Sequence, residues 1–177
     1  MAKQSNTGKQ GSTEKQNSAE KLNSAEKQNS SVIQNQAYPQ LRLCNQLCFP
    51  LYACAKELVR RYAPLLEPFN LTYTHYITMM VIWEKGSLTV SELGKALYLD
   101  SGTLTPVLKK LENHGYITRT RKADDERCVM VSPTQAGLEL QEKLKDVPAE
   151  IGCSVRLSPE DARQLYVLLH KMLGTMA

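Results

Sequence analysis

The sequence predicts a mainly α-helical protein with a small β-hairpin, preceded by a low-complexity arm. Apolar residues recur at helical spacing in several segments after residue 41. Two short β-prone runs flank a charged hexapeptide, which is typical of a hairpin. The first 37 residues hold too few large apolar side chains to form a core. We therefore expect a disordered arm at 1–37 and a folded domain at 38–177.

The arm contains a six-residue repeat. Glutamate, lysine, asparagine and serine each recur at this interval, as in Glu14, Glu20 and Glu26. A period of six matches neither the 3.5- nor the 3.6-residue helical repeat, so the pattern favours a solvated, disordered segment. A basic arm that reaches DNA is the alternative, but lysines exceed glutamates only slightly in this segment.

Composition excludes several classes of protein. The 177-residue chain has a formal net charge of +4, so any nucleic-acid contact must be local. It shows neither a transmembrane stretch nor a secretory signal, which predicts a cytoplasmic protein that does not bind membranes. The cysteines are odd in number and form no CxxC pair, so we expect no disulfide framework, no metal site and no cofactor. They are Cys44, Cys48, Cys54, Cys128 and Cys153.

The elements follow from apolar spacing and from turn residues. An apolar stripe predicts a first helix at about 45–62, ended by Pro64 and Pro68. Three further helices are expected at about 72–83, 91–97 and 101–114, the last stopped by Gly115. Strands follow at 116–121 and 128–132, and then helices at about 134–146 and 158–176. Ser158, Pro159 and the acids after them have the chemistry of a helix start.

The order of helix, short turn, helix and charged hairpin predicts a winged helix–turn–helix head at about 72–133. The helix expected at about 101–114 points hydroxyl and lysine side chains outward, which suits contacts with the bases of a major groove and with nearby phosphates. They are Ser101, Thr103, Thr105, Lys109 and Lys110. The hairpin adds a cluster that can enter a minor groove: Arg119, Arg121, Lys122, Asp125 and Arg127. A solvated hairpin with local ion pairs is the simpler reading of that cluster alone.

Two runs of residues resemble a known family. The segment DSGTLTPVLKKLE (100–112), with GYITR (115–119) and DDER (124–127), is similar to the MarR-type transcriptional regulators. The run NQLCF (45–49) resembles the sensor segment of their organic-hydroperoxide-sensing branch. The resemblance covers about Leu41 to the C-terminus and leaves the arm unmatched.

The resemblance implies a homodimer that represses a gene from a pseudo-palindromic, double-stranded operator. The helices at 45–62, 134–146 and 158–176 would form the dimerisation region. Their apolar stripes exceed what a small head can bury, which favours a dimer independently.

The resemblance also implies that Cys48 is the redox sensor. A cysteine near the start of a helix lies where unpaired N–H groups favour a thiolate. By resemblance, Tyr62 and Tyr73 would hydrogen-bond the sulfur from the opposing subunit, and Tyr52 lies one turn after Cys48. An organic hydroperoxide would oxidise the thiolate to a sulfenic acid, which then condenses with a thiol. That thiol is Cys153, Cys44 or a low-molecular-weight thiol, whereas Cys54 and Cys128 are expected to be packing residues.

Three other functions remain open at this stage. A small phenolic or lipophilic ligand could induce release instead, with no role for a cysteine. A thiol peroxidase would use Cys48 catalytically, but it would leave the head unexplained, so we expect no enzyme. A protein-interaction module on the same fold would leave Asp125 and Arg127 without a purpose.

Overall fold

The computed structural model describes residues 38–122 and 125–176, with the side chains of 122–127 excepted. The predicted arm at 1–37 lies outside the described residues, so its boundary stays a prediction. The chain forms two compact units, Met1–Lys56 and Glu57–Ala177, which we describe separately.

The described part of the first unit holds two short 3-10 helices and the start of a long α-helix. These are η1 (Pro39–Leu41), η2 (Leu43–Asn45) and α2 (Cys48–Leu66). Gln46, after η2, has an extended backbone with φ −96° and ψ 118°. The helix that the sequence predicted from residue 45 therefore begins at Cys48.

The first predicted helix also ends later than expected, beyond residue 62. The helix passes through Pro64 and ends at Leu66, which is fully buried. A helical proline removes one N–H and strains the preceding turn. Two residues after Pro64, Leu66 is part of the hydrophobic core. The 3-10 helix η3 (Glu67–Phe69) follows, with Pro68 in its first turn and a left-handed Asn70 after it.

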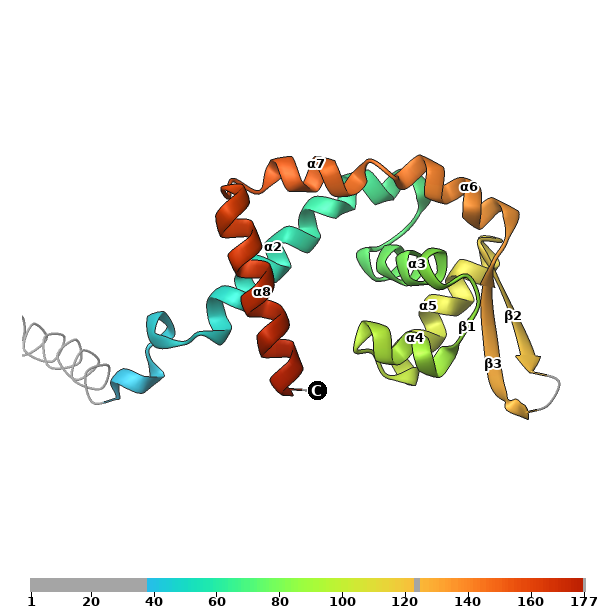
Figure 1. Cartoon of the computed structure of the whole chain (residues 1–177), viewed down its shortest axis with the longest axis horizontal. Coiled ribbons are helices and arrows are strands. Elements are labelled where there is room, and N and C mark those ends of the chain that lie inside the picture. Colours follow the sequence, from blue (N-terminus) through green and yellow to red (C-terminus); the bar gives the residue numbers. More distant parts are fainter. Residues whose placement is uncertain (1–37, 123–124, 177) are drawn as a thin grey trace, which may run out of the picture. The chain divides into compact units, whose positions relative to one another are not determined.

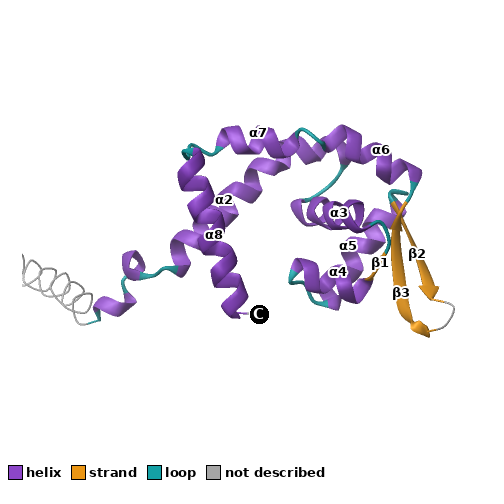
Figure 2. Ribbon diagram, viewed as in Figure 1, coloured by secondary structure: helices purple, strands orange, loops and turns teal. Residues whose placement is uncertain are grey.

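The head follows in the predicted order. It comprises α3 (Tyr73–Lys85), α4 (Val90–Leu97), α5 (Ser101–Asn113) and the strands β2 (Ile117–Lys122) and β3 (Asp125–Pro133). The sequence missed a further strand, β1 (Leu88–Thr89), which pairs antiparallel with β3. The three strands have the order β1-β3-β2 (Figures 1 and 2). The predicted mainly helical fold with a small winged sheet is confirmed.

The core of the head lies between its helices and the sheet. The side chains with at most 1% exposure there include Met79, Ile82, Leu93, Leu104, Leu108, Leu111, Ile117 and Val131. The apolar positions that the sequence assigned to the inner face of α5 are thus the buried ones. Gly115 ends the helix region with φ +74°, as predicted, because glycine adopts this conformation without strain.

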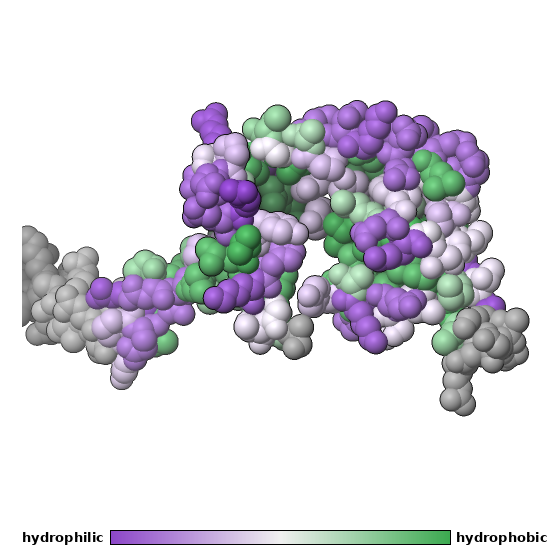
Figure 3. All heavy atoms as spheres, in the orientation of Figure 1, coloured by the Kyte–Doolittle hydropathy of each residue, from purple (hydrophilic) through white to green (hydrophobic). Residues whose placement is uncertain are grey.

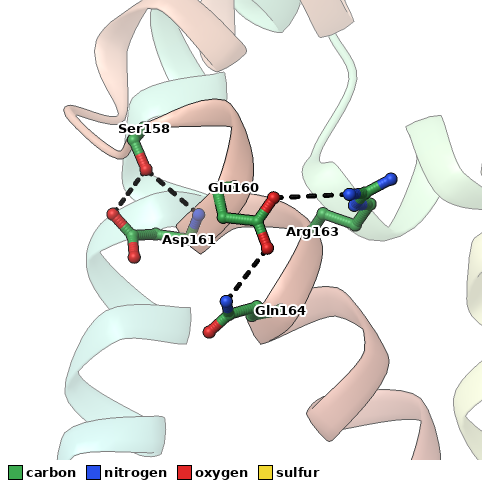
Figure 4. Close-up of polar contacts among 5 residues, drawn as sticks. All are labelled: Ser158, Glu160, Asp161, Arg163 and Gln164. Atoms are coloured by element: carbon green, nitrogen blue, oxygen red, sulfur yellow. Dashed lines mark hydrogen bonds and ion pairs between the residues drawn. The ribbon is translucent and has the colours of Figure 1, made fainter.

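Three helices complete the chain: α6 (Gln135–Leu144), α7 (Val147–Ser154) and α8 (Pro159–Met176). The predicted helix at 134–146 is therefore shorter, and α7 was missed. At the start of α8 the Ser158 hydroxyl oxygen accepts the N–H of Asp161 at 3.1 Å and donates to its carboxylate (Figure 4). This capping confirms the helix start expected at Ser158.

The start of α6 is seated tightly on the head. The Thr134 backbone N–H donates to the Tyr116 carbonyl at 3.0 Å, and the Trp83 indole donates to the Gly137 carbonyl at 2.9 Å. A Cβ on Gly137 would overlap the Tyr116 carbonyl oxygen. Only glycine therefore allows α6 to approach β2 this closely.

Helix α8 buries none of its residues in the chain. Its exposed apolar side chains include Leu165, Tyr166, Val167 and Leu168. Figure 3 shows hydrophobic residues, in green, on the surface over α8. Within the described residues, no helix is both long and apolar enough to cross a membrane.

Candidate DNA-binding and redox-sensing sites

The turn between α4 and α5 places the front of α5 at the surface. Tyr98 adopts a left-handed backbone with φ 54°, and the Leu99 N–H closes the turn on the Gly94 carbonyl at 2.9 Å. Asp100 then caps α5, because its Oδ1 accepts the Thr103 N–H at 2.8 Å. These hydrogen bonds to Thr103 hold the pKa of the Asp100 carboxyl below its usual range. The capping carboxylate is therefore ionised at neutral pH and favours the helix start.

The predicted recognition residues form one outward face of α5. Ser101, Thr103, Thr105 and Lys109 are exposed, and Lys110 is half-buried. Two hydroxyls are engaged within the helix: Thr105 donates to the Ser101 carbonyl at 2.7 Å, and Thr103 donates to Asp100 at 3.0 Å. Pro106 lies inside α5 without ending it. The face thus presents small polar groups at its front and lysines further along.

The wing residues divide into two groups. Arg121 is an exposed cation on β2. Arg119 instead holds Glu112 of α5, with Nε 3.0 Å and Nη2 2.5 Å from the same carboxylate oxygen. The side chains of Lys122, Asp125 and Arg127 lie outside the described residues, so their roles stay predictions. The sequence did not indicate the partner of Arg119, although Glu112 lies only one turn before the hairpin.

Cys48 is the first residue of α2 and is exposed. Tyr52 lies one helical turn further on the same face, and it is exposed as well. Cys44 was expected one turn before Cys48, but it lies in η2, separated from α2 by the extended Gln46. Its thiol is also exposed, and it hydrogen-bonds Asn45 at 3.6 Å.

Tyr62 of α2 and Tyr73, the first residue of α3, lie side by side. Their ring centroids lie 4.8 Å apart, and the ring of Tyr76 lies 5.7 Å from that of Tyr62. Burial raises the pKa of each of these phenols above the ordinary tyrosine value. They keep their protons at neutral pH and can donate hydrogen bonds. Sequence reasoning missed Tyr76, although its spacing of three from Tyr73 was a visible signal.

Cys153 lies in α7, not in a link between helices as the sequence suggested. It is exposed, and the Arg61 guanidinium of α2 donates to the carbonyl of its neighbour Ser154. Cys54 is exposed and Cys128 is half-buried, so the expected packing role does not suit Cys54. Within the described residues, no cluster of histidine, cysteine or acidic side chains could hold a metal ion.

The comparisons with known proteins agree with this architecture. The chain is 45% identical over 139 residues to the organic hydroperoxide resistance transcriptional regulator of Bacillus subtilis strain 168, covering 78% of this chain and 95% of that protein. The chain belongs to the MarR family of transcriptional regulators. It falls in the organic-hydroperoxide-sensing branch, as the sequence motifs indicated. A family model described as transcriptional regulator SarA/Rot also matches residues 60–144.

Other MarR-family relatives add to this match. SarZ of Staphylococcus epidermidis is 40% identical over 123 residues, covering 70% of this chain and 83% of SarZ. Reduced AbfR bound to DNA superposes with a TM-score of 0.66 and 30% identity, covering 81% of this chain and 99% of AbfR. MarR-family proteins are DNA-binding regulators and not enzymes, which removes the peroxidase alternative.

Proposed function

We propose that this protein represses transcription as a homodimer on a pseudo-palindromic operator and leaves the DNA when an organic hydroperoxide oxidises Cys48. The observation that carries the proposal is the exposed Cys48 at the start of α2. A match over 78% of the chain to the Bacillus subtilis organic hydroperoxide regulator necessarily includes this position. We place the protein in the cytoplasm, where a sensor thiol is kept reduced.

The oxidation step follows from thiolate chemistry. The Cys48 sulfur attacks the terminal oxygen of the hydroperoxide, so that an S–O bond forms and the O–O bond breaks. The sulfur loses two electrons and becomes a sulfenic acid, while the organic alkoxide leaves and takes up a proton. Cys48 is exposed at the first position of α2, so a hydroperoxide can reach its sulfur.

Tyr62 and Tyr73 support the sensor from the other subunit. The resemblance implies this arrangement, and the structure supplies the donors: the rings of Tyr62 and Tyr73 lie 4.8 Å apart, and burial raises the pKa of both phenols. In a two-fold dimer, the pair would donate hydrogen bonds to the partner subunit's Cys48. Oxidation changes the acceptor from a thiolate to a sulfenic acid or disulfide and weakens those bonds.

Among the candidate thiols, we favour Cys153 as the resolving cysteine. The contact of Arg61 with Ser154 holds the end of α7 against the turn of α2 that carries Tyr62. A partner sulfur seated on the tyrosine pair would therefore approach Cys153. Its thiol sulfur would attack the sulfenic acid, forming an S–S bond between subunits and releasing water. Cys44 and a low-molecular-weight thiol are the alternatives, and AbfR has a solved disulfide form.

Two surfaces would contact the operator. The outward face of α5, from Ser101 to Lys110, enters the major groove, and the wing with Arg121, Lys122, Asp125 and Arg127 reaches the adjacent minor groove. A dimer places two such heads on half-sites about one DNA turn apart. The exposed apolar side chains of α8 and α2 supply the dimerisation surface, because a monomer would leave them in water.

A gel-shift experiment with an organic hydroperoxide tests the proposal. Wild-type protein should release the operator, and the Cys48→Ser variant should bind it equally well but fail to release it. Cys54→Ser is the matched control, because Cys54 is exposed on the same helix. Release of Cys48→Ser by the hydroperoxide would contradict the proposal. Release of both proteins by a phenolic ligand alone would favour the ligand-induced alternative.

A further inference from the structure

The ion pair between Glu112 and Arg119 joins the two DNA-binding elements of the head. Glu112 lies in the last turn of α5, and Arg119 lies in β2 at the base of the wing. The Nε and Nη2 atoms of Arg119 lie 3.0 Å and 2.5 Å from one carboxylate oxygen of Glu112. Two donors from one planar guanidinium fix the direction of the pair as well as its distance.

This pair differs from the surface ion pairs of the chain. Its side chains are only 29% and 35% exposed. The pairs Arg60–Glu57, Lys145–Glu142 and Arg163–Glu160 each join residues three apart in the sequence, and their side chains are at least 50% exposed. Such exposed pairs contribute little and position nothing outside their own helix. The pair of Glu112 with Arg119, in contrast, ties a strand to a helix.

Strand geometry extends this restraint to Arg121. Side chains alternate between the two faces of a strand, so Ile117, Arg119 and Arg121 share one face of β2. Ile117 is buried in the core, and Arg119 contacts α5. The pairing of Arg119 with Val131 and of Arg121 with Val129 is regular, and the first irregularity comes after Arg121. Arg121 is thereby held on the side of the wing that faces α5.

We infer that Glu112 and Arg119 form a positioning pair, which aligns Arg121 of the wing with the recognition helix so that both contact the same DNA. Two of the five N–H donors of the Arg119 guanidinium are directed to Glu112, so the role assigned to Arg119 is to hold the wing on α5. This inference rests on the proposed binding of an operator by α5 and the wing.

Electrostatic attraction and wing alignment predict opposite effects of losing Glu112. Loss of Glu112 removes a negative charge from a DNA-binding surface and frees Arg119, which alone would strengthen the attraction to phosphates. We expect the opposite: Glu112→Ala should weaken operator binding about tenfold, since the wing loses its alignment. Glu142→Ala removes the same charge from the exposed ion pair with Lys145 at the end of α6 and should leave affinity unchanged or slightly improved.

The test measures fluorescence anisotropy on a labelled duplex that the wild-type protein selects from a random-sequence pool. Arg121→Ala is introduced into the wild-type and Glu112→Ala proteins, and affinity is recorded against salt concentration. In the wild type, Arg121→Ala should weaken binding and reduce the salt slope by about 0.9, the value for one phosphate contact. In the Glu112→Ala background most of that effect should be gone, because Arg121 is no longer aligned.

Two results would overturn the inference. One is unchanged or tighter binding by Glu112→Ala. The other is a full effect of Arg121→Ala in the Glu112→Ala background, which would show that Arg121 needs no alignment. Thermal unfolding of each variant separates loss of alignment from loss of fold. If Glu112→Ala is unstable, Glu112→Gln is used: it removes the same charge but keeps one acceptor oxygen, so its binding should weaken by less than tenfold, and tighter binding would overturn the inference. A wild-type protein that selects no duplex would refute the proposed operator binding itself, which is a different result.

Discussion

Substitution of Gly137 by alanine tests how closely α6 is seated on the head. The added Cβ would overlap the carbonyl oxygen of Tyr116 and would lie 3.1 Å from its carbonyl carbon and 3.4 Å from Met79 Cε. Two of these atoms belong to the backbone, so relief requires α6 or the start of β2 to shift. The Trp83 hydrogen bond to the Gly137 carbonyl would be disturbed by the same shift.

The expected cost follows from opposing effects. Alanine is favoured over glycine in a helix by about 0.5–1 kcal/mol. Overpacking against fixed atoms typically costs about 1–3 kcal/mol, and contact with a backbone carbonyl places this site at the upper end. We expect a net loss of about 2 kcal/mol in the free energy of unfolding, which lowers Tm by about 4–8 °C for a chain of this size.

Thermal and urea unfolding at one fixed protomer concentration measure this loss, because a dimer's stability depends on concentration. Gly152→Ala is the matched control, since a Cβ there has no atom of this chain within 4 Å. The control should be unchanged or slightly stabilised. A Gly137→Ala protein as stable as the control would refute the close approach of α6 to Tyr116.

Three further predictions concern the sensor and the head. Tyr62→Phe keeps the ring whose centroid lies 4.8 Å from that of Tyr73, so Tm should be unchanged. The hydroperoxide concentration needed for operator release in gel shifts should rise. Asp100→Ala removes the α5 cap and should weaken operator binding in anisotropy, whereas Asp100→Asn, which can still cap, should retain most of it. Burial lowers the pKa of His75, and the nearby Lys110 and His114 lower it further. Its Nδ1 accepts the Thr72 N–H at 3.0 Å. Below pH 6.5 the unfolded chain therefore binds more protons at this position than the folded chain, so the free energy of unfolding should fall as the pH drops. Urea unfolding should show this loss in wild type but less of it in His75→Gln, which cannot titrate; equal losses would contradict the role of His75.

The sequence predicted the head well because its signals there are local. The inner face of α5 and the glycine at 115 each depend on residues within a few positions of one another, and the same holds for the cap of α8 at Ser158. Such signals are visible without knowledge of the fold.

The misses were features that depend on contacts far along the chain. Strand β1 has two residues and is defined by its pairing with Met130 and Val131. Helix α2 continues through Pro64 to the buried Leu66, which no local rule reveals. The partner of Arg119 depends on the angle between α5 and β2. The positive charge of the wing was therefore visible in the sequence, but the pairing of Arg119 with Glu112 and the exposure of Arg121 were not.

The central claim is that oxidation of Cys48 alone releases the operator. The most direct measurement titrates operator-bound protein with organic hydroperoxide from zero to two equivalents per subunit, while anisotropy follows release and mass spectrometry maps the oxidised cysteine. The account predicts complete release at one equivalent per subunit, with the modification or disulfide on Cys48 in step with release. Release while Cys48 stays reduced, or full oxidation of Cys48 on protein that remains bound, would contradict it.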